Sequence, residues 1–230
     1  MYVFYKYSDK GKPPRLNNQV ISKQKVFPNF YRHFASENII LILDNVNDET
    51  VKWFDTFYPS LKKHRTTLGN AGAMSYIYRL ITQIPDMNDI AFICEDDYWF
   101  LDKSAQCIKE GLNVVDFVNL YDHPDKYMNP SPNPFIKNGM EETRVFLTPS
   151  THWKFTNSTT GSFAMKVITM IRNFEVMMVF NDGHKMMDDF GMFCRLRQMG
   201  ITLATPIPSK SCHLDNLNPA PLIDWQKEIN

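Results

Sequence analysis

The chain has 230 residues, 43% of them hydrophobic, and its 25 basic and 25 acidic side chains cancel to a formal net charge of zero. This composition excludes a disordered chain, and the balanced charge gives no reason to expect a nucleic-acid partner. No apolar run approaches the ~18 residues of a membrane span. The four cysteines show no CxxC spacing. We therefore expect a cytoplasmic protein without a disulfide framework.

Strand and helix patterns alternate along the first half of the sequence. Short apolar runs bounded by polar residues predict strands at residues 1–7, 39–43, 90–94 and 114–118. A further short strand is expected near residues 65–68, before the glycines at 69 and 72. Apolar residues with helical spacing predict helices around 27–34, at 48–58, around 74–84 and at 102–111. Pro28 is expected in the first turn of the first of these helices. The βαβα order predicts an α/β fold with a mostly parallel sheet and helices on both faces.

The second half of the chain has a looser pattern. Residues 121–143 contain four prolines and predict a long irregular loop. Strands are expected at 145–147, 152–155 and 201–207, helices at 163–180 and 186–199, and a polar tail at 208–230. The sequence shows no internal repeat and no interdomain linker. We therefore expect a single domain over residues 1–230.

The most informative stretch follows the strand expected at residues 90–94. Its apolar run ends in Glu95, Asp96 and Asp97, with two aromatic residues after them. Ligands of open α/β sheets bind at the carboxyl ends of such strands. Three consecutive carboxylates repel one another, and a bound divalent cation is the simplest way to offset that repulsion. The triplet therefore predicts a metal that carries a diphosphate, with a solvated acidic turn as the alternative.

Other polar residues gather at the ends of the first three predicted strands. They are Ser8 and Asp9, then Asp44 and Asn45, then Gly69, Asn70 and Gly72. Asp44 would accept hydrogen bonds from a base or a ribose, and the two glycines would let the backbone approach a ligand at a helix N-terminus. The glycine turn lacks both the lysine of a P-loop and the third glycine of a Rossmann fingerprint. A dinucleotide oxidoreductase is therefore disfavoured.

Several polar and aromatic side chains in the second half are further candidates for ligand binding. Lys126, His152 and Lys154 are expected partners for a diphosphate, and Trp99 and Trp153 offer flat faces on which a sugar could stack. The alternative for each is an ordinary hydrogen-bonded loop residue.

Three further residues are candidates for catalysis and metal binding. Asp188 and Asp189 begin a predicted helix, so they either cap it or supply a general base that takes a proton from an attacking hydroxyl. His213 follows the last predicted strand. It is a candidate metal ligand that would complete the acidic site, with an exposed tail residue as the alternative.

The order and spacing of these motifs resemble GT-A glycosyltransferases, in particular the family-two-like enzymes of bacteria and viruses. The small GT-A enzymes of chlorella viruses are the most similar type. The resemblance is carried by residues 3–9, 43–45, 68–72, 95–98, 121–127, 150–160, 188–190 and 206–213.

This resemblance implies a UDP- or GDP-linked sugar donor and Mn²⁺ or Mg²⁺. The neutral net charge gives no attraction to a membrane surface, so we expect a glycan or glycoprotein acceptor instead of a lipid. The resemblance aligns Glu95, Asp96 and Asp97 with the Asp-x-Asp metal motif of the family, with glutamate in the first place. Asp44 and residues 69–72 match its nucleoside contacts, and Asp188 or Asp189 matches the base of inverting members. Residues 1–120 would form the nucleotide-binding half and 121–230 the acceptor and catalytic half. A viral protein would act in the host cytoplasm.

Two other functions fit the same sequence. A sugar-phosphate nucleotidyltransferase also combines a metal with a Rossmann-like sheet, although residues 11–15 are a poor version of the glycine-rich basic loop it uses. A non-catalytic module that binds nucleotide sugars would keep the fold without turnover.

Overall fold

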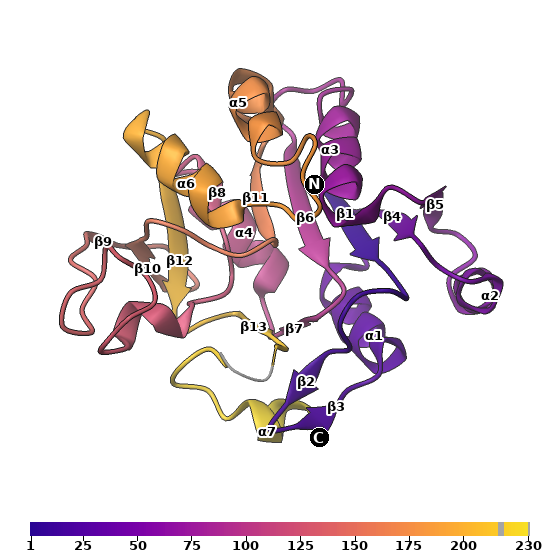
Figure 1. The fold of residues 1–230 in the computed structure, drawn as a ribbon, viewed down its shortest axis with the longest axis horizontal. Helices are drawn as coiled ribbons and strands as arrows, with labels where there is room; N and C mark the ends of the chain where they lie inside the picture. The colour runs from indigo at the N-terminus through magenta and orange to yellow at the C-terminus, as the bar shows by residue number, and fades with distance from the viewer. Residues whose placement is uncertain (216–218, 230) are drawn as a thin grey trace.

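The computed structural model describes residues 1–215 and 219–229, and a large sheet runs through its centre. The strands of this sheet are β1 (Tyr2–Tyr7), β4 (Asn38–Asp44), β5 (Lys62–Thr66), β6 (Ile90–Glu95), β8 (Phe117–Val118), β9 (Val145–Leu147), β10 (His152–Phe155), β11 (Phe163–Lys166) and β12 (Leu203–Ile207). Their order is β5-β4-β1-β6-β11-β8-β12-β10-β9 (Figure 1). All of these strands except β10 and β11 run in one direction.

Helices and two small sheets complete the fold. The helices are α1 (Lys23–Phe34), α2 (Asp48–Phe57), α3 (Gly69–Ile81), α4 (Ser104–Gly111), the 3₁₀ helix η1 (Pro124–Tyr127), α5 (Val167–Val179), α6 (Asp189–Gln198) and α7 (Trp225–Ile229). The small sheets pair β7 (Tyr98–Phe100) with β13 (Ser211–His213) and β2 (Arg15–Leu16) with β3 (Gln19–Val20). Within the described residues, no helix has the length and apolarity needed to cross a bilayer.

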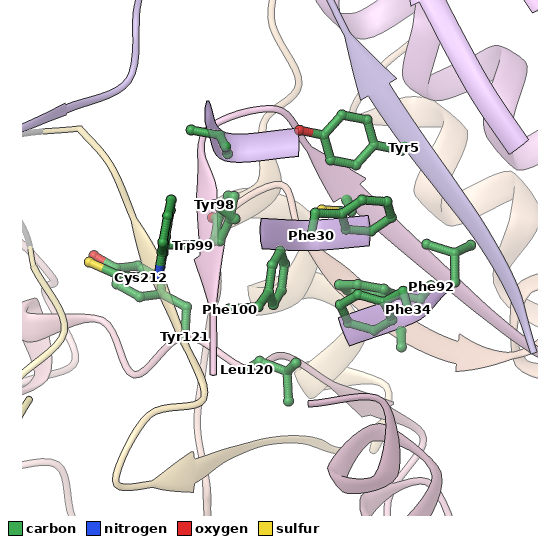
Figure 2. Packing of buried hydrophobic residues seen from close by; sticks show 14 of the residues in the cluster. Tyr5, Phe30, Phe34, Phe92, Tyr98, Trp99, Phe100, Leu120, Tyr121 and Cys212 are labelled. Carbon is green, nitrogen blue, oxygen red and sulfur yellow. The ribbon is translucent and has the colours of Figure 1, made fainter. Parts of the chain in front are cut away.

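Alternation along the central strands divides the core into two layers. In β1, Val3 and Tyr5 join a cluster with residues of α1, α2 and α4, whereas Phe4 joins a cluster with residues of α3, α5 and α6. The first cluster is rich in aromatic rings, among them Phe30 and Phe34 (Figure 2). The helices therefore cover both faces of the sheet, which confirms the predicted α/β fold.

The structure corrects three local predictions. Residues 163–166 form strand β11 instead of the start of a helix, because this segment is inserted antiparallel between β6 and β8. Strand β5 covers 62–66 instead of 65–68; it is a polar edge strand that lacks an apolar pattern. Pro28 lies inside α1, beyond its first turn, because the helix begins earlier, where Ser22 accepts a hydrogen bond from the Lys25 backbone N–H.

Candidate active site

The acidic triplet lies at the carboxyl end of β6, and each of its carboxylates has its own cationic partner. The pairs are Lys6 with Glu95 (Nζ–Oε1 2.5 Å), Lys23 with Asp96 (Nζ–Oδ2 2.6 Å) and His213 with Asp97 (Nε2–Oδ2 3.1 Å). Three protein cations thus provide the charge compensation that the sequence suggested a metal would give. The triplet does not need a metal to be held together.

Glu95 lies beneath the loop that leads into β11. Its backbone N–H donates to Ser162 Oγ at 3.0 Å, and a Cβ atom added at Gly161 would lie 2.1 Å from its Oε2. Lys6 stands beside it because the two residues are register partners in the parallel strands β1 and β6. This carboxylate is therefore enclosed by protein on two sides.

Asp96 fastens the segment that follows β1. It accepts hydrogen bonds from the Ser8 backbone N–H at 2.8 Å and from Lys23, whose ammonium also donates to the Ser8 carbonyl. Burial raises the pKa of Asp96 to about 6; Lys23 opposes this rise, and the neighbouring Asp97 adds to it. Ser8 and Asp96, two of the residues proposed from the sequence to line the site, are therefore hydrogen-bonded to each other.

Asp97 and His213 form the pair that faces the C-terminal segment. Strand β13 pairs with β7, which sets His213 opposite Tyr98 and stacks the two rings with centroids 4.9 Å apart. Asp97 Oδ1 is buried and has no hydrogen-bond partner among the residues that the structure describes. Asp215 lies on the other side of the imidazole, with Oδ2 3.8 Å from Nδ1.

These surroundings shift the pKa values of both partners in opposite directions. Burial lowers the pKa of His213, but the charge and hydrogen bond of Asp97, with Asp215 and Glu95, outweigh it and raise that pKa to about 9. Burial raises the pKa of Asp97, and His213 and the two lysines outweigh it, so that this pKa is lowered. The pair is therefore an ionised carboxylate beside an imidazolium at neutral pH.

Asp188 and Asp189 occupy different environments at the start of α6. Asp188 is exposed and caps the helix, accepting from the Gly191 backbone N–H at 2.8 Å. Asp189 is half-buried, and burial together with the charge of Glu95 raises its pKa to about 7. A carboxylate with this pKa accepts a proton readily near neutral pH. Asp189 is the better placed of the two for general base catalysis.

Asp44 organises the turn between β5 and α3. The residue is buried and accepts four hydrogen bonds, from the Asn45 side chain, Thr66 Oγ1 and the backbone N–H groups of Leu68 and Gly69, at 2.6 to 3.0 Å. A carboxylate accepts about four such bonds, so its capacity is already used within the protein. Asp44 and Asn45 therefore shape the edge of the site.

Three other residues that the sequence suggested for donor binding also hold the edge of the site in place. Asn70 accepts from the Met187 backbone N–H at 3.2 Å and reaches Glu95 Oε1 at 3.5 Å, which joins the segment before α6 to the acidic triplet. Gly72 is required by close packing, because a Cβ there would lie 2.9 Å from Leu68 Cβ. Asp9 accepts from the Asn47 backbone N–H and from Thr50 Oγ1 at the start of α2.

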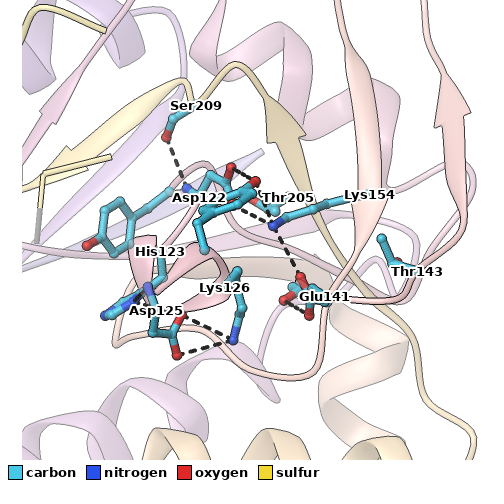
Figure 3. Close-up of polar contacts among 12 residues, drawn as sticks. Asp122, His123, Asp125, Lys126, Glu141, Thr143, Lys154, Thr205 and Ser209 are labelled. Atoms are coloured by element: carbon cyan, nitrogen blue, oxygen red, sulfur yellow. Dashed lines mark hydrogen bonds and ion pairs between the residues drawn. The ribbon is translucent and has the colours of Figure 1, made fainter. Parts of the chain in front are cut away.

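Lys126 of η1 and Lys154 of β10 lie inside the protein, in a polar network that joins the 121–143 loop to β10 and the residues after it (Figure 3). Lys154 contacts Asp122 and Glu141 at 2.9 and 3.1 Å. Lys126 donates to Asn157 Oδ1 at 2.7 Å and to Ser158 Oγ at 2.9 Å. Both ammonium groups are thus used to hold the loop, and the structure does not bring them to the acidic triplet.

The remaining residues that were expected to contact the sugar or the diphosphate do not lie together. Trp153 has no exposed surface, stacks on Phe146 and donates its indole N–H to Thr148, so no ring face is open to a sugar. Trp99 is nearly buried in β7. His152 is exposed on β10, which β11, β8 and β12 separate from β6.

The sequence interpretation missed Lys6 and Lys23, which compensate two of the three acids. Lys6 carried a signal, since it is a charged residue within an apolar strand pattern and is only 7% exposed. Lys23 carried none, because it stands in the first turn of α1 and meets Asp96 only in the folded chain.

No protein-family model matches the chain, and no curated protein matches it in sequence. Many solved structures are similar to the chain in fold, among them the following two. GalNAc-T7 with UDP, GalNAc and Mn²⁺ is 14% identical over 97% of this chain, with a TM-score of 0.57. The synthetase of CMP-2-keto-3-deoxy-manno-octonic acid in complex with CTP is 11% identical over 88% of this chain and 87% of its own, with a TM-score of 0.52.

These likenesses establish the fold at identities too low to establish an activity. The chain spans 45% of the length of the GalNAc-T7 structure. The predicted GT-A-like architecture is confirmed, whereas the closer resemblance to the chlorella-virus enzymes stays a prediction.

Proposed function

We propose that the chain transfers a sugar from a nucleotide-diphosphate donor to a hydroxyl of a glycan or glycoprotein, with inversion at the anomeric carbon. The observation that carries this proposal is that the Asp97–His213 pair follows β6 and that Asp189 lies near enough to Glu95, the last residue of that strand, and to His213 for their charges to interact. The fold shared with GalNAc-T7, whose structure holds UDP and Mn²⁺, supports the same donor class.

Asp97 and His213 are the residues that fit a divalent metal. The buried, unpartnered Oδ1 of Asp97 is the type of oxygen ligand that Mn²⁺ or Mg²⁺ binds. His213 beside it would become a nitrogen ligand for Mn²⁺ on losing the proton that Asp97 holds on its imidazole. The described part of the chain holds no cluster of three or more such ligands, so phosphate oxygens and water would complete the coordination. When bound, the metal would neutralise charge on the departing diphosphate.

Asp189 would be the general base. Its carboxylate is close enough to Glu95 for their charges to interact, and its pKa of about 7 allows it to hold the proton of the attacking hydroxyl. Lys6 and Lys23 would keep Glu95 and Asp96 in place while charge changes around them. In this proposal Ser8, Asn45 and Gly69 line the donor side at the ends of β1, β4 and β5.

Calorimetric titration with UDP and GDP, each with and without Mn²⁺, tests the donor site. We expect one nucleotide to bind in a metal-dependent manner and Asp97→Ala to lose that binding. His184→Ala, an exposed histidine outside the site, is the control. Failure of both nucleotides to bind under either condition would contradict the proposed donor class.

A sugar-phosphate nucleotidyltransferase is the second candidate, favoured by the similar fold and length of the CTP-bound synthetase. The two reactions release different products from different substrates. A glycosyltransferase releases a nucleoside diphosphate from a nucleotide sugar, whereas a nucleotidyltransferase releases pyrophosphate from CTP or UTP and a sugar substrate. Product analysis with both substrate sets decides between them, and nucleotide binding without either product would indicate a non-catalytic module.

A further inference from the structure

An exposed pair of aromatic rings lies beside the proposed base. Phe135 comes from the 121–143 loop and is 57% exposed, and Phe190 comes from α6 and is 36% exposed. Their rings stack with centroids 6.2 Å apart and an interplanar angle of 30°. Exposed phenylalanines cost free energy in water unless a ligand covers them, so this pair suggests a binding surface.

The position of the pair relates it to the reaction. Phe190 directly follows Asp189, the residue whose pKa is raised by burial and by Glu95. Phe135 reaches the same place from the 121–143 loop, because its ring stacks on that of Phe190. A molecule stacked on these rings would therefore have its polar groups within reach of the Asp189 region.

The loop presents Phe135 from a fixed backbone. The Phe135 backbone N–H donates to Asn133 Oδ1 at 3.1 Å, and the same oxygen accepts from Asn157 Nδ2 at 3.1 Å. Asn133 also donates to Asp125 at 3.0 Å, and Lys126 joins this buried network. Because these polar groups are buried and hydrogen-bonded, the backbone that carries the ring is held in place before any ligand arrives.

We propose that Phe135 and Phe190 form an acceptor subsite that binds a neutral pyranose by its apolar C–H face. The C–H groups of such a face carry partial positive charge and match the negative face of an aromatic ring, and the hydroxyls stay directed to solvent or to Asp189. This inference rests on the proposed glycosyl transfer and names the chemistry of its acceptor. Flat rings favour a sugar ring over the flexible chains of a lipid.

Saturation-transfer difference NMR on the full chain tests the subsite. The probes are the methyl pyranosides of galactose, glucose, mannose and N-acetylglucosamine, each measured with and without UDP and Mn²⁺. We expect saturation on the protons of one ring face of at least one probe, and a loss of roughly five- to tenfold in binding in Phe135→Ala and Phe190→Ala. Phe57→Ala removes an equally exposed ring from α2 and is the matched control.

Each result decides the question. Absence of saturation for all probes in both conditions, or an equal loss in Phe57→Ala, overturns the subsite. Binding of phosphatidylcholine vesicles that Phe135→Ala abolishes, without binding of the glycosides, would replace it with a lipid surface. Ring-dependent saturation without any nucleotide binding would leave the sugar subsite standing and reject the glycosyl transfer.

Discussion

Oδ2 of Asp97 lies 3.1 Å from Nε2 of His213, although 116 residues separate them in the chain. The pairing of β13 with β7 brings them together, because it sets His213 opposite the residue that follows Asp97. The C-terminal segment thus completes the acidic end of β6. A charged imidazole and a buried carboxylate in this contact make the stability of the fold depend on pH.

His213→Gln tests this dependence in metal-free protein. The folded pKa of about 9 exceeds the ordinary 6.5, so the stabilising effect of the charged imidazole is fully present below pH 6.5 and is lost as the pH rises through 9. Between pH 6.5 and pH 9, the free energy of unfolding of the wild type should therefore fall by about 3 kcal/mol more than that of His213→Gln. Urea denaturation at several pH values measures it.

His184→Gln provides the control for that experiment, because His184 is exposed. Its profile should follow that of the wild type throughout. If the wild type and His213→Gln lose stability in parallel between pH 6.5 and 9, the pair does not carry the charge that its geometry indicates.

If the chain transfers sugar as proposed, Asp189→Asn should lower the transfer rate by about 10²- to 10⁴-fold while donor binding is retained, because it removes the proposed general base. Since the pKa of Asp189 is about 7, kcat/KM of the wild type should rise with pH to about 7 and then level off. Asp188→Asn is the matched control: asparagine caps a helix as well as aspartate does, so activity should persist.

A stability measurement separates the catalytic role of Asp189 from a structural one. The folded-state pKa is raised above its ordinary value, so the ionised carboxylate destabilises the fold above pH 7. Asp189→Asn should therefore raise the free energy of unfolding at pH 8. A variant that is inactive and also less stable than the wild type would indicate that Asp189 supports the structure instead.

Local patterns in the sequence located the acidic end of the central strand but not its charge compensation. The apolar run before Glu95 marked β6 and placed the acidic triplet at its carboxyl end. The partners of the acids come from distant segments: Lys23 lies on α1, and its approach to Asp96 depends on how that helix packs on the sheet. Such contacts leave no periodic signal in the chain.

The same limit explains the lysines that were expected to bind phosphate. A lysine looks exposed in sequence, yet Lys126 is 2% and Lys154 3% exposed. Lys126 turns inward from the 121–143 loop to Asn157 and Ser158, and Lys154 on β10 pairs with Asp122 and Glu141 of that loop. Residues 163–166 show a similar conflict. Their mostly apolar sequence is compatible with a helix as well as a strand. They form a strand because they pair with both β6 and β8.

Lys6→Met should destabilise the fold by about 3 kcal/mol, because it leaves Glu95 partly buried without its cation. Adding Glu95→Gln should recover part of this loss, and a double-mutant cycle from chemical denaturation measures the coupling. Lys63→Met removes the partner of Asp55, which is 59% exposed, and should cost less than about 1 kcal/mol. Equal losses in the two lysine variants would contradict a buried Lys6–Glu95 pair.

Gly161→Ala should disturb the site through Glu95, because the added methyl group would lie 2.1 Å from Oε2. The carboxylate must move, and overpacking of this kind costs about 1–3 kcal/mol. Combining Gly161→Ala with Glu95→Asp shortens the acidic side chain and makes room for the methyl group. The double variant should therefore recover part of the lost stability and part of the lost nucleotide binding. Gly183→Ala is the control: it strains a backbone with φ of +79° but meets no atom within 4 Å, so it should leave nucleotide binding intact. Thermal unfolding and calorimetric titration together report both effects, and a Gly161→Ala protein with wild-type binding would show that Glu95 is not held by this loop.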